Sequence, residues 1–312
     1  MPLTIRTLDT GHRFSQLSST FVAQRLHALQ PGVPLNILAL SCGAGAGAVA
    51  GLTRSGSRPD FEVVTGVSIG ALIAPYAFLG PTWDARLLEA FNNGPGQDFL
   101  QPRGLGAIFG SSLYRGAPLR QLVDAYVSDE MIRAVAREAD KGRLLLVGTT
   151  DVATGEPVIW DLGAIARNGG PDARTLFRNV LVASASIPGV FPPVMIRVRE
   201  DGATHDEAHV DGVATMPFFV PPAFAETPPE TLAGTHRTAV YVIIDGQLGE
   251  TARTTRLTRP LLRYAYECAQ AGRLWRTFRR TDDDRGTAGT GDETQKVPCP
   301  ADDEFVRPFA SR

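Results

Sequence analysis

The sequence predicts an α/β protein with three layers, α/β/α, around a mainly parallel central sheet. Apolar, β-branched runs at 35–40, 61–65 and 240–244 predict buried strands. The first two runs lead into glycine-containing turns, each followed by small residues that suit a helix. Strands that alternate with helices are typical of a parallel sheet covered on both faces. Because ligands of such sheets bind at the carboxyl ends of the strands, we expect the functional residues in these turns.

One large domain with two flanking segments is expected. Residues 1–34 form a polar lead-in with a short helix at 21–29, residues 35–280 form the α/β domain, and residues 281–312 are polar enough to be disordered. Within the domain, the spacing of apolar residues predicts one core-facing helix over 118–137.

Composition restricts the class of protein. The chain has 312 residues, of which 43% are hydrophobic, so it can bury a sizeable core. A formal net charge of −2 gives no general attraction to nucleic acid, and we expect none as a partner. The three cysteines offer neither a disulfide framework nor paired metal-ligand spacing. Neither a signal peptide nor a run of ~20 apolar residues is found, which predicts a cytoplasmic protein.

The most informative motif is Gly66-Val67-Ser68-Ile69-Gly70, between a predicted strand and a predicted helix. Its motif glycines, Gly66 and Gly70, permit a sharp turn and close approach of neighbouring chain. The turn holds the serine oxygen at the positive end of a helix, which suits a nucleophile whose attack creates a negative oxygen nearby. The same pentapeptide also occurs where a serine only caps a helix.

A second motif, Ser-Cys-Gly-Ala-Gly-Ala-Gly-Ala at 41–48, follows the first strand. Backbone N–H groups in such a turn can bind either an oxyanion or a phosphate. The spacing also fits the loose dinucleotide fingerprint, but Asp60 and Glu62 stand at the start of the next strand instead of its end. A nucleotide-binding α/β protein is therefore kept as an alternative.

A third motif, His209-Val210-Asp211-Gly212, places an aspartate at the end of a predicted strand. Taken alone, it favours an ordinary Asx turn. The order Ser68, Asp211, His236 is formally that of a catalytic triad. His236 lies in a polar connection, however, so a solvent-facing loop histidine is the preferred interpretation, and His209 is expected on a strand face.

Together these motifs resemble the patatin-like phospholipase family from about residue 35 to residue 246. The matching pieces are 38–41 with its glycine loop, 65–72, 183–193 (Ala-Ser-Ala-Ser-Ile-Pro-Gly-Val-Phe-Pro-Pro) and 209–212. The resemblance implies a lipid acyl hydrolase with a Ser–Asp dyad, in which Ser68 is the nucleophile and Asp211 the base. It further implies an acyl-enzyme, phospholipids or other acyl esters as substrates, and no required metal or cofactor.

The same resemblance assigns the oxyanion hole to backbone N–H groups of Gly43, Ala44, Gly45 and Ile69, with Gly212 as the motif glycine after the aspartate. Cys42 and Ala44 replace glycines of the family's loop, and Ala46 replaces its polar residue. A catalytically impaired, lipid-binding member of the family is therefore the main alternative function.

A basic amphipathic helix is predicted over 257–280. Such a helix can make peripheral contact with an anionic membrane surface, which would suit a phospholipase. A core-packed helix with a solvated basic face is the preferred interpretation.

Overall fold

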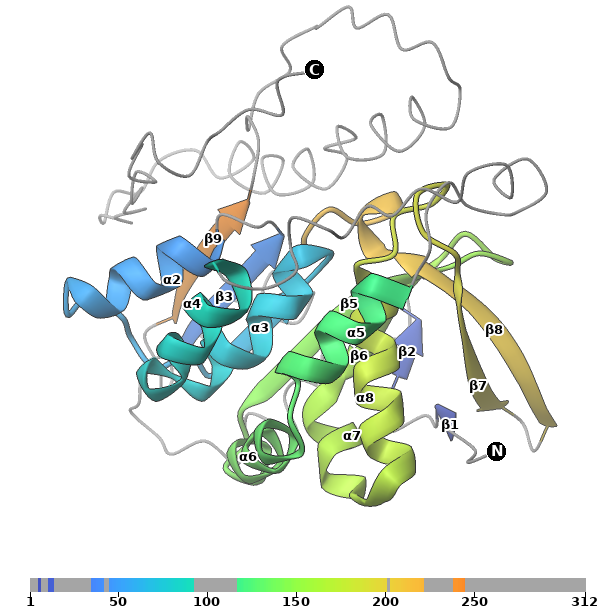
Figure 1. Ribbon diagram of the computed structural model, residues 1–312, viewed down its shortest axis with the longest axis horizontal. Helices are drawn as coiled ribbons and strands as arrows, with labels where there is room; N and C mark the ends of the chain where they lie inside the picture. The colour runs from blue at the N-terminus through green and yellow to red at the C-terminus, as the bar shows by residue number, and fades with distance from the viewer. Residues whose placement is uncertain are drawn as a thin grey trace, which may run out of the picture.

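The computed structural model describes residues 5–6, 11–13, 35–41, 45–92, 117–200, 203–221 and 238–244. These residues form an α/β fold in which a layer of helices packs on a sheet, so the predicted fold class is confirmed (Figure 1). The strands are β1 (Ile5–Arg6), β2 (Gly11–Arg13), β3 (Leu35–Ser41), β4 (Val63–Gly66), β5 (Leu144–Asp151), β6 (Pro157–Asp161), β7 (Val194–Glu200), β8 (Ala203–Asp211) and β9 (Thr238–Ile244). The helices are α2 (Gly45–Arg54), α3 (Ile69–Leu79), α4 (Asp84–Asn92), α5 (Ala117–Tyr126), α6 (Asp129–Asp140), α7 (Leu162–Asn168) and α8 (Gly170–Ser184).

The sheet is parallel at its centre and mixed toward one margin. The strands β9, β3, β4 and β5 lie side by side and run parallel. Strand β5 also pairs antiparallel with β6 and with β8. Strand β8 pairs antiparallel with β7, and β7 pairs in parallel with β1. The order among the described strands is β1-β7-β8-β5-β4-β3-β9, with β6 paired to β5 and β2 to β6.

β4 and β8 meet end to end beside β5. β4 pairs with β5 as far as Gly66↔Val147, and β8 pairs with β5 from Thr149↔Asp211 onward. Because β6 pairs with the same Thr149 on the other edge of β5, β8 must lie along the edge that β4 leaves free. β4 runs parallel and β8 antiparallel to β5, so their carboxyl ends face the same gap. This topology brings two distant parts of the sequence together at one point.

Two apolar cores lie on the two faces of the sheet. Alternate residues of β3 point to opposite faces, so Leu38 belongs to the larger core and Ile37 to the smaller one. The larger core joins the sheet to α2 through α8. Within the described residues, the smaller core is covered by Met216 and Phe219 of the segment that follows β8. Packing on both faces explains why the central strands are almost entirely apolar.

The predicted helix over 118–137 is wrong in one respect, because the structure has two helices there, α5 and α6. The chain leaves the helical conformation at Ser128, whose Oγ accepts a hydrogen bond from the N–H of Met131 at 3.2 Å. Ser128 is therefore an N-cap, and Asp129 and Glu130 in the first turn of α6 favour a helix start at this point.

Several predicted features lie outside the described residues. These are the short helix at 21–29, the basic helix at 257–280 and the polar segment at 281–312. No helix within the described ranges is long and apolar enough to cross a membrane.

Candidate active site

Ser68 lies in a strained turn between β4 and α3. Its backbone has φ 59° and ψ −133°, and among the described residues it is the non-glycine residue with positive φ. Such a conformation costs about 1–3 kcal/mol, so the surroundings must enforce it. A Cβ at Gly66 would lie 2.7 Å from Cα of Ala71, and a Cβ at Gly70 would overlap the carbonyl of Leu40. Both motif glycines are therefore required by close packing of the turn against β3 and α3.

Two hydrogen bonds fix this turn to the rest of the domain. The N–H of Val67 donates to the carbonyl of Leu40 at 3.0 Å, which ties the turn to β3. The N–H of Ser68 donates to Oγ of Ser184 at 3.1 Å, and that hydroxyl donates to the carbonyl of Gly148 at 2.7 Å. The turn is thus held from both sides, by β3 and by the end of α8.

Asp211, the last residue of β8, accepts the hydrogen bond of the Ser68 hydroxyl. The distance from Oγ of Ser68 to Oδ2 of Asp211 is 2.7 Å, and the N–H of Val213 donates to Oδ1 at 2.9 Å. The aspartate is 1% exposed. A Cβ at Gly212 would lie 2.6 Å from the carbonyl oxygen of Gly148, so only glycine fits after the aspartate. The structure thus places side by side the two residues to which the family resemblance gives the roles of nucleophile and base.

Burial raises the pKa of Asp211 from its ordinary value of 3.8 to about 7. Desolvation of the carboxylate is the largest cause, and the hydrogen bonds from Ser68 and from the N–H of Val213 partly oppose it. A base works best when its pKa lies near the working pH, because it is then ionised yet still basic enough to take a proton. The site therefore contains a hydroxyl and a carboxylate with the geometry and basicity of a nucleophile–base pair.

A buried polar cluster lies on β8 and its neighbours, next to Asp211 in sequence. His209 is fully buried, with Nδ1 3.1 Å from Oγ1 of Thr149 and Nε2 3.1 Å from Oε2 of Glu207. Nε1–H of Trp160 donates to the same threonine oxygen at 2.8 Å. Since Thr149 is the register partner of Asp211, this cluster ties the end of β8 to β5. The prediction that His209 lies on a strand face agrees with this position.

The predicted oxyanion residues are only partly within the described chain. Gly45 is the first residue of α2, where an added Cβ would lie 3.3 Å from side-chain atoms of Ile73 and of Leu40. Ile69 is the first residue of α3, and its side chain is 41% exposed. Gly43 and Ala44 lie outside the described residues, as does His236 of the triad alternative.

Sequence reasoning missed two serines at the end of α8. Ser184 binds the N–H of Ser68, and the carbonyl of Ser186 accepts the N–H of Asp211 at 2.9 Å. Both belong to the Ala-Ser-Ala-Ser-Ile-Pro motif, which was used to identify the family resemblance. The motif was therefore noticed, but the hydrogen bonds that its serines make to Ser68 and Asp211 were not predicted. Among the described residues, no group of three His, Cys, Asp or Glu is placed to hold a metal ion.

Comparison with known proteins assigns the family. The model of the patatin-like phospholipase family matches residues 39–224, more than half of the chain, so the protein belongs to this family. Membership supports a lipid acyl hydrolase in general terms. No curated protein sequence matches the chain significantly. The crystal structure of VipD from Legionella pneumophila is similar, with a TM-score of 0.41 and 12% identity over 85% of this chain and 57% of that chain. The chain thus matches little more than half of that protein.

Proposed function

We propose that this protein is a serine hydrolase that cleaves the carboxylic ester bonds of phospholipids or related lipids. The observation that carries the proposal is the 2.7 Å hydrogen bond from Oγ of Ser68, in a strained turn, to the buried carboxylate of Asp211. A serine hydroxyl is a weak nucleophile until an adjacent base takes its proton, and here the base is already in contact. Membership in the patatin-like phospholipase family supports a lipid as the substrate.

The reaction proceeds through an acyl-enzyme. Oγ of Ser68 attacks the ester carbonyl while its proton passes to Oδ2 of Asp211. The tetrahedral intermediate collapses, the carbon–oxygen bond to the alcohol breaks, and Asp211 returns the proton to the leaving alkoxide. Water then attacks the acyl-enzyme, gives a proton to Asp211 and releases the fatty acid, and the proton returns to Ser68.

The oxyanion that forms in both steps needs hydrogen-bond donors. The N–H of Ser68 is not available, because it donates to Ser184. Ile69 is the first residue of α3, so its N–H has no intrahelical acceptor and lies at the positive end of the helix dipole. We therefore assign one donor to the N–H of Ile69 and the others to the N–H groups of Gly43, Ala44 and Gly45, the last of which begins α2.

Hydrolysis of p-nitrophenyl esters by the wild type, Ser68→Ala and Asp211→Asn tests this function. We expect kcat to fall about 10³-fold or more in both variants, since removal of either member of such a pair disables the same step. A fluorophosphonate should label Ser68, as read by mass spectrometry of the labelled peptide. The exposed Ser57 provides a matched control, and Ser57→Ala should keep full activity and labelling.

One outcome of this experiment counts against the proposal, and a vesicle-binding measurement would then test the alternative. A folded wild type with neither turnover nor label would show that the site does not hydrolyse esters. If such a protein still bound lipid vesicles, and Ser68→Ala bound them equally well, the lipid-binding alternative would be supported.

A further inference from the structure

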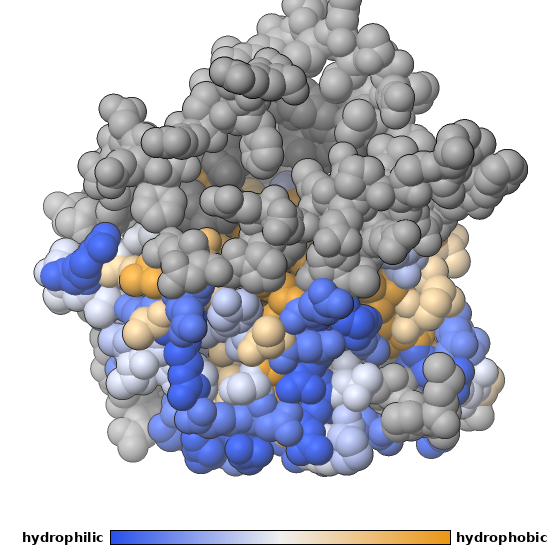
Figure 2. Space-filling view, viewed as in Figure 1, coloured by the Kyte–Doolittle hydropathy of each residue, from blue (hydrophilic) through white to orange (hydrophobic). Residues whose placement is uncertain are grey.

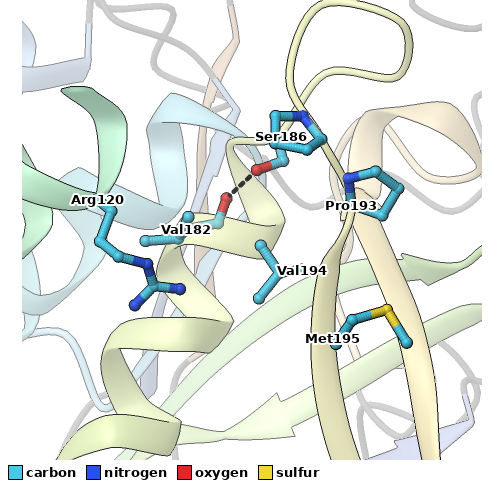
Figure 3. A pocket seen from close by; sticks show the side chains of 7 residues that line it. Arg120, Val182, Ser186, Pro193, Val194 and Met195 are labelled. Atoms are coloured by element: carbon cyan, nitrogen blue, oxygen red, sulfur yellow. Dashed lines mark hydrogen bonds between the residues drawn. The ribbon is translucent and has the colours of Figure 1, made fainter. Parts of the chain in front are cut away.

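A pocket that the hydrolytic mechanism does not use lies between α8, α5 and β7. Its volume is about 310 Å³, and its lining side chains are Arg120, Val182, Ser186, Pro192, Pro193, Val194 and Met195. Figure 3 shows Arg120 extending from α5 on one side and Pro193, Val194 and Met195 on the other. The pocket thus has apolar walls with a cation at one end.

Ser186 connects this pocket to the candidate active site. Its carbonyl accepts the N–H of Asp211 at 2.9 Å, while its hydroxyl donates to the carbonyl of Val182 at 2.7 Å (Figure 3). Two residues earlier, Ser184 binds the N–H of Ser68. The segment at the end of α8 therefore contacts both the pocket and the backbone of Ser68 and Asp211.

Arg120 differs from the other partly buried arginines of the helical layer. It is partly buried, and no carboxylate of the described residues lies within ion-pair distance of it. A charge that is partly removed from water without a partner is costly, so such a guanidinium favours an anionic ligand. Its counterparts each have a carboxylate partner, in the pairs Arg58–Asp84 at 2.6 Å, Arg143–Glu138 at 2.8 Å and Arg178–Asp129 at 2.8 Å.

The walls and the size of the pocket restrict the rest of the ligand. Val182, Pro192, Pro193, Val194 and Met195 are apolar, and Met195 is 56% exposed, as expected at a rim. A volume of about 310 Å³ is at the lower end for ligand pockets, so it holds part of a lipid and not a whole two-chain phospholipid. Figure 2 shows apolar side chains on the described surface, mainly toward its upper part. Exposed apolar residues near the candidate active site in sequence are Ile69, at 41%, and Ile187, at 37%.

We propose that this pocket binds the phosphate of a glycerophospholipid whose ester reacts at Ser68, with Arg120 paired to the phosphate and the apolar wall against the adjoining glycerol and acyl carbons. This inference rests on the proposed function, and it adds that Arg120 gives the enzyme a preference for esters that carry a phosphate over neutral esters. Arg120 is then a specificity-determining residue that plays no part in bond cleavage.

Two monoacyl substrates that differ only in the phosphate provide the test. They are 1-decanoylglycerol 3-phosphate and 1-decanoylglycerol, used below their critical micelle concentrations, with released decanoate measured by mass spectrometry. We expect Arg120→Gln to lower kcat/KM about tenfold for the phosphate ester, as for loss of a charge-assisted hydrogen bond, and less than twofold for the neutral ester. Arg133→Gln, at an exposed arginine of α6, is the matched control and should change neither value.

A second variant keeps the test valid if Arg120→Gln folds poorly. Met195 is largely exposed, so Met195→Glu should fold normally and place a negative charge at the rim. It should lower kcat/KM for the phosphate ester several-fold and leave the neutral ester unchanged. Equal losses on both esters, or no loss on either in both variants, would overturn the proposal.

Binding to the Ser68→Ala variant separates this proposal from the proposed function. Calorimetry should show 1-decanoylglycerol 3-phosphate binding about tenfold more weakly after the added Arg120→Gln change. That result would support the pocket even if the wild type hydrolysed neither ester. If decanoate competes in an Arg120-dependent way and the phosphate ester does not, the pocket holds the released carboxylate instead, and the proposal fails.

Discussion

Ser68 and Asp211 come from two regions of the sheet that are built in different ways. Ser68 follows β4 in the parallel centre, where a local strand–turn–helix unit holds it through glycine packing and a strained backbone. Asp211 ends β8 in the antiparallel margin, where burial, register with Thr149 and two accepted hydrogen bonds hold it. The comparison shows that steric packing positions the proposed nucleophile, whereas burial and polar contacts position and tune the proposed base.

The largest effect should come from a substitution that disrupts the close packing of the Ser68 turn. Gly70→Ala puts a Cβ into the carbonyl of Leu40, so we expect a loss of about 3 kcal/mol or more in the free energy of unfolding, measured in urea. Gly51→Ala is the matched control, because nothing lies within 4 Å of a Cβ there and alanine suits the interior of α2. That change should stabilise the protein by about 0.5–1 kcal/mol. An equally mild Gly70→Ala would show that packing does not hold the turn.

The second prediction concerns the raised pKa of the buried Asp211 and its effect on stability. Between pH 4 and pH 7 the unfolded chain releases the proton of this carboxyl, while the folded protein keeps it because its pKa is about 7. Native protein then binds more protons, so the stability contribution of Asp211 is present at low pH and is lost as pH rises. Asp211→Asn removes this decrease in stability with rising pH, because asparagine does not titrate. We expect its folding equilibrium constant to exceed that of the wild type by at least ~10-fold at pH 8, with the advantage shrinking toward pH 4.

Guanidinium unfolding at the two pH values measures this difference. An Asp211→Asn variant whose stability relative to the wild type does not change with pH would mean that the carboxyl is not desolvated in the folded protein.

The third effect concerns the polar cluster next to Asp211. His209→Ala removes the buried imidazole that joins Glu207 to Thr149, so we expect a loss of about 2–3 kcal/mol in the free energy of unfolding. His205 provides the control: its Nε2 lies 3.3 Å from the other carboxylate oxygen of Glu207, Oε1, but its side chain is 47% exposed, so His205→Ala should change stability by less than about 0.5 kcal/mol. Similar small losses of stability in both variants would show that the buried polar cluster does not stabilise the end of β8.

The smallest effect should come from the hydroxyl of Ser184, which joins the Ser68 turn to β5. Ser184→Ala removes the hydroxyl that joins the N–H of Ser68 to the carbonyl of Gly148, and it should cost about 1–2 kcal/mol in thermal unfolding. The freed N–H becomes a new donor beside the reacting centre, so kcat should change less than fivefold in either direction. A loss of activity as large as that of Ser68→Ala would show that Ser184 has a direct part in the reaction.

The same comparison explains which features were predictable from sequence. The turn at Ser68 was predictable because its signals are local: an apolar strand, two glycines and a helical stretch within about ten residues. Asp211 by itself suggested only an Asx turn, and its place beside Ser68 depends on β8 continuing the edge of β5 that β4 leaves free. Such long-range pairing has no local signature, so here the family resemblance was more informative than the residue pattern.

Two other differences have particular physical reasons. The helix break at Ser128 was missed because the apolar spacing continues through it, although the N-cap serine and the acidic residues after it were visible signals. That Arg120 has no ion-pair partner among the described residues was not predictable, because this depends on which carboxylates lie nearby after folding.

The role of Asp211 as the base is best tested by the pH dependence of kcat/KM for a soluble p-nitrophenyl ester. If Asp211 takes the proton of Ser68, kcat/KM should rise about tenfold per pH unit below pH 7 and level off above it, because only the ionised carboxylate is a base. The residual activity of Asp211→Asn should lack this inflection. A wild-type profile that is flat between pH 5 and pH 9, or an inflection that survives in Asp211→Asn, would contradict the assignment of Asp211 as the base.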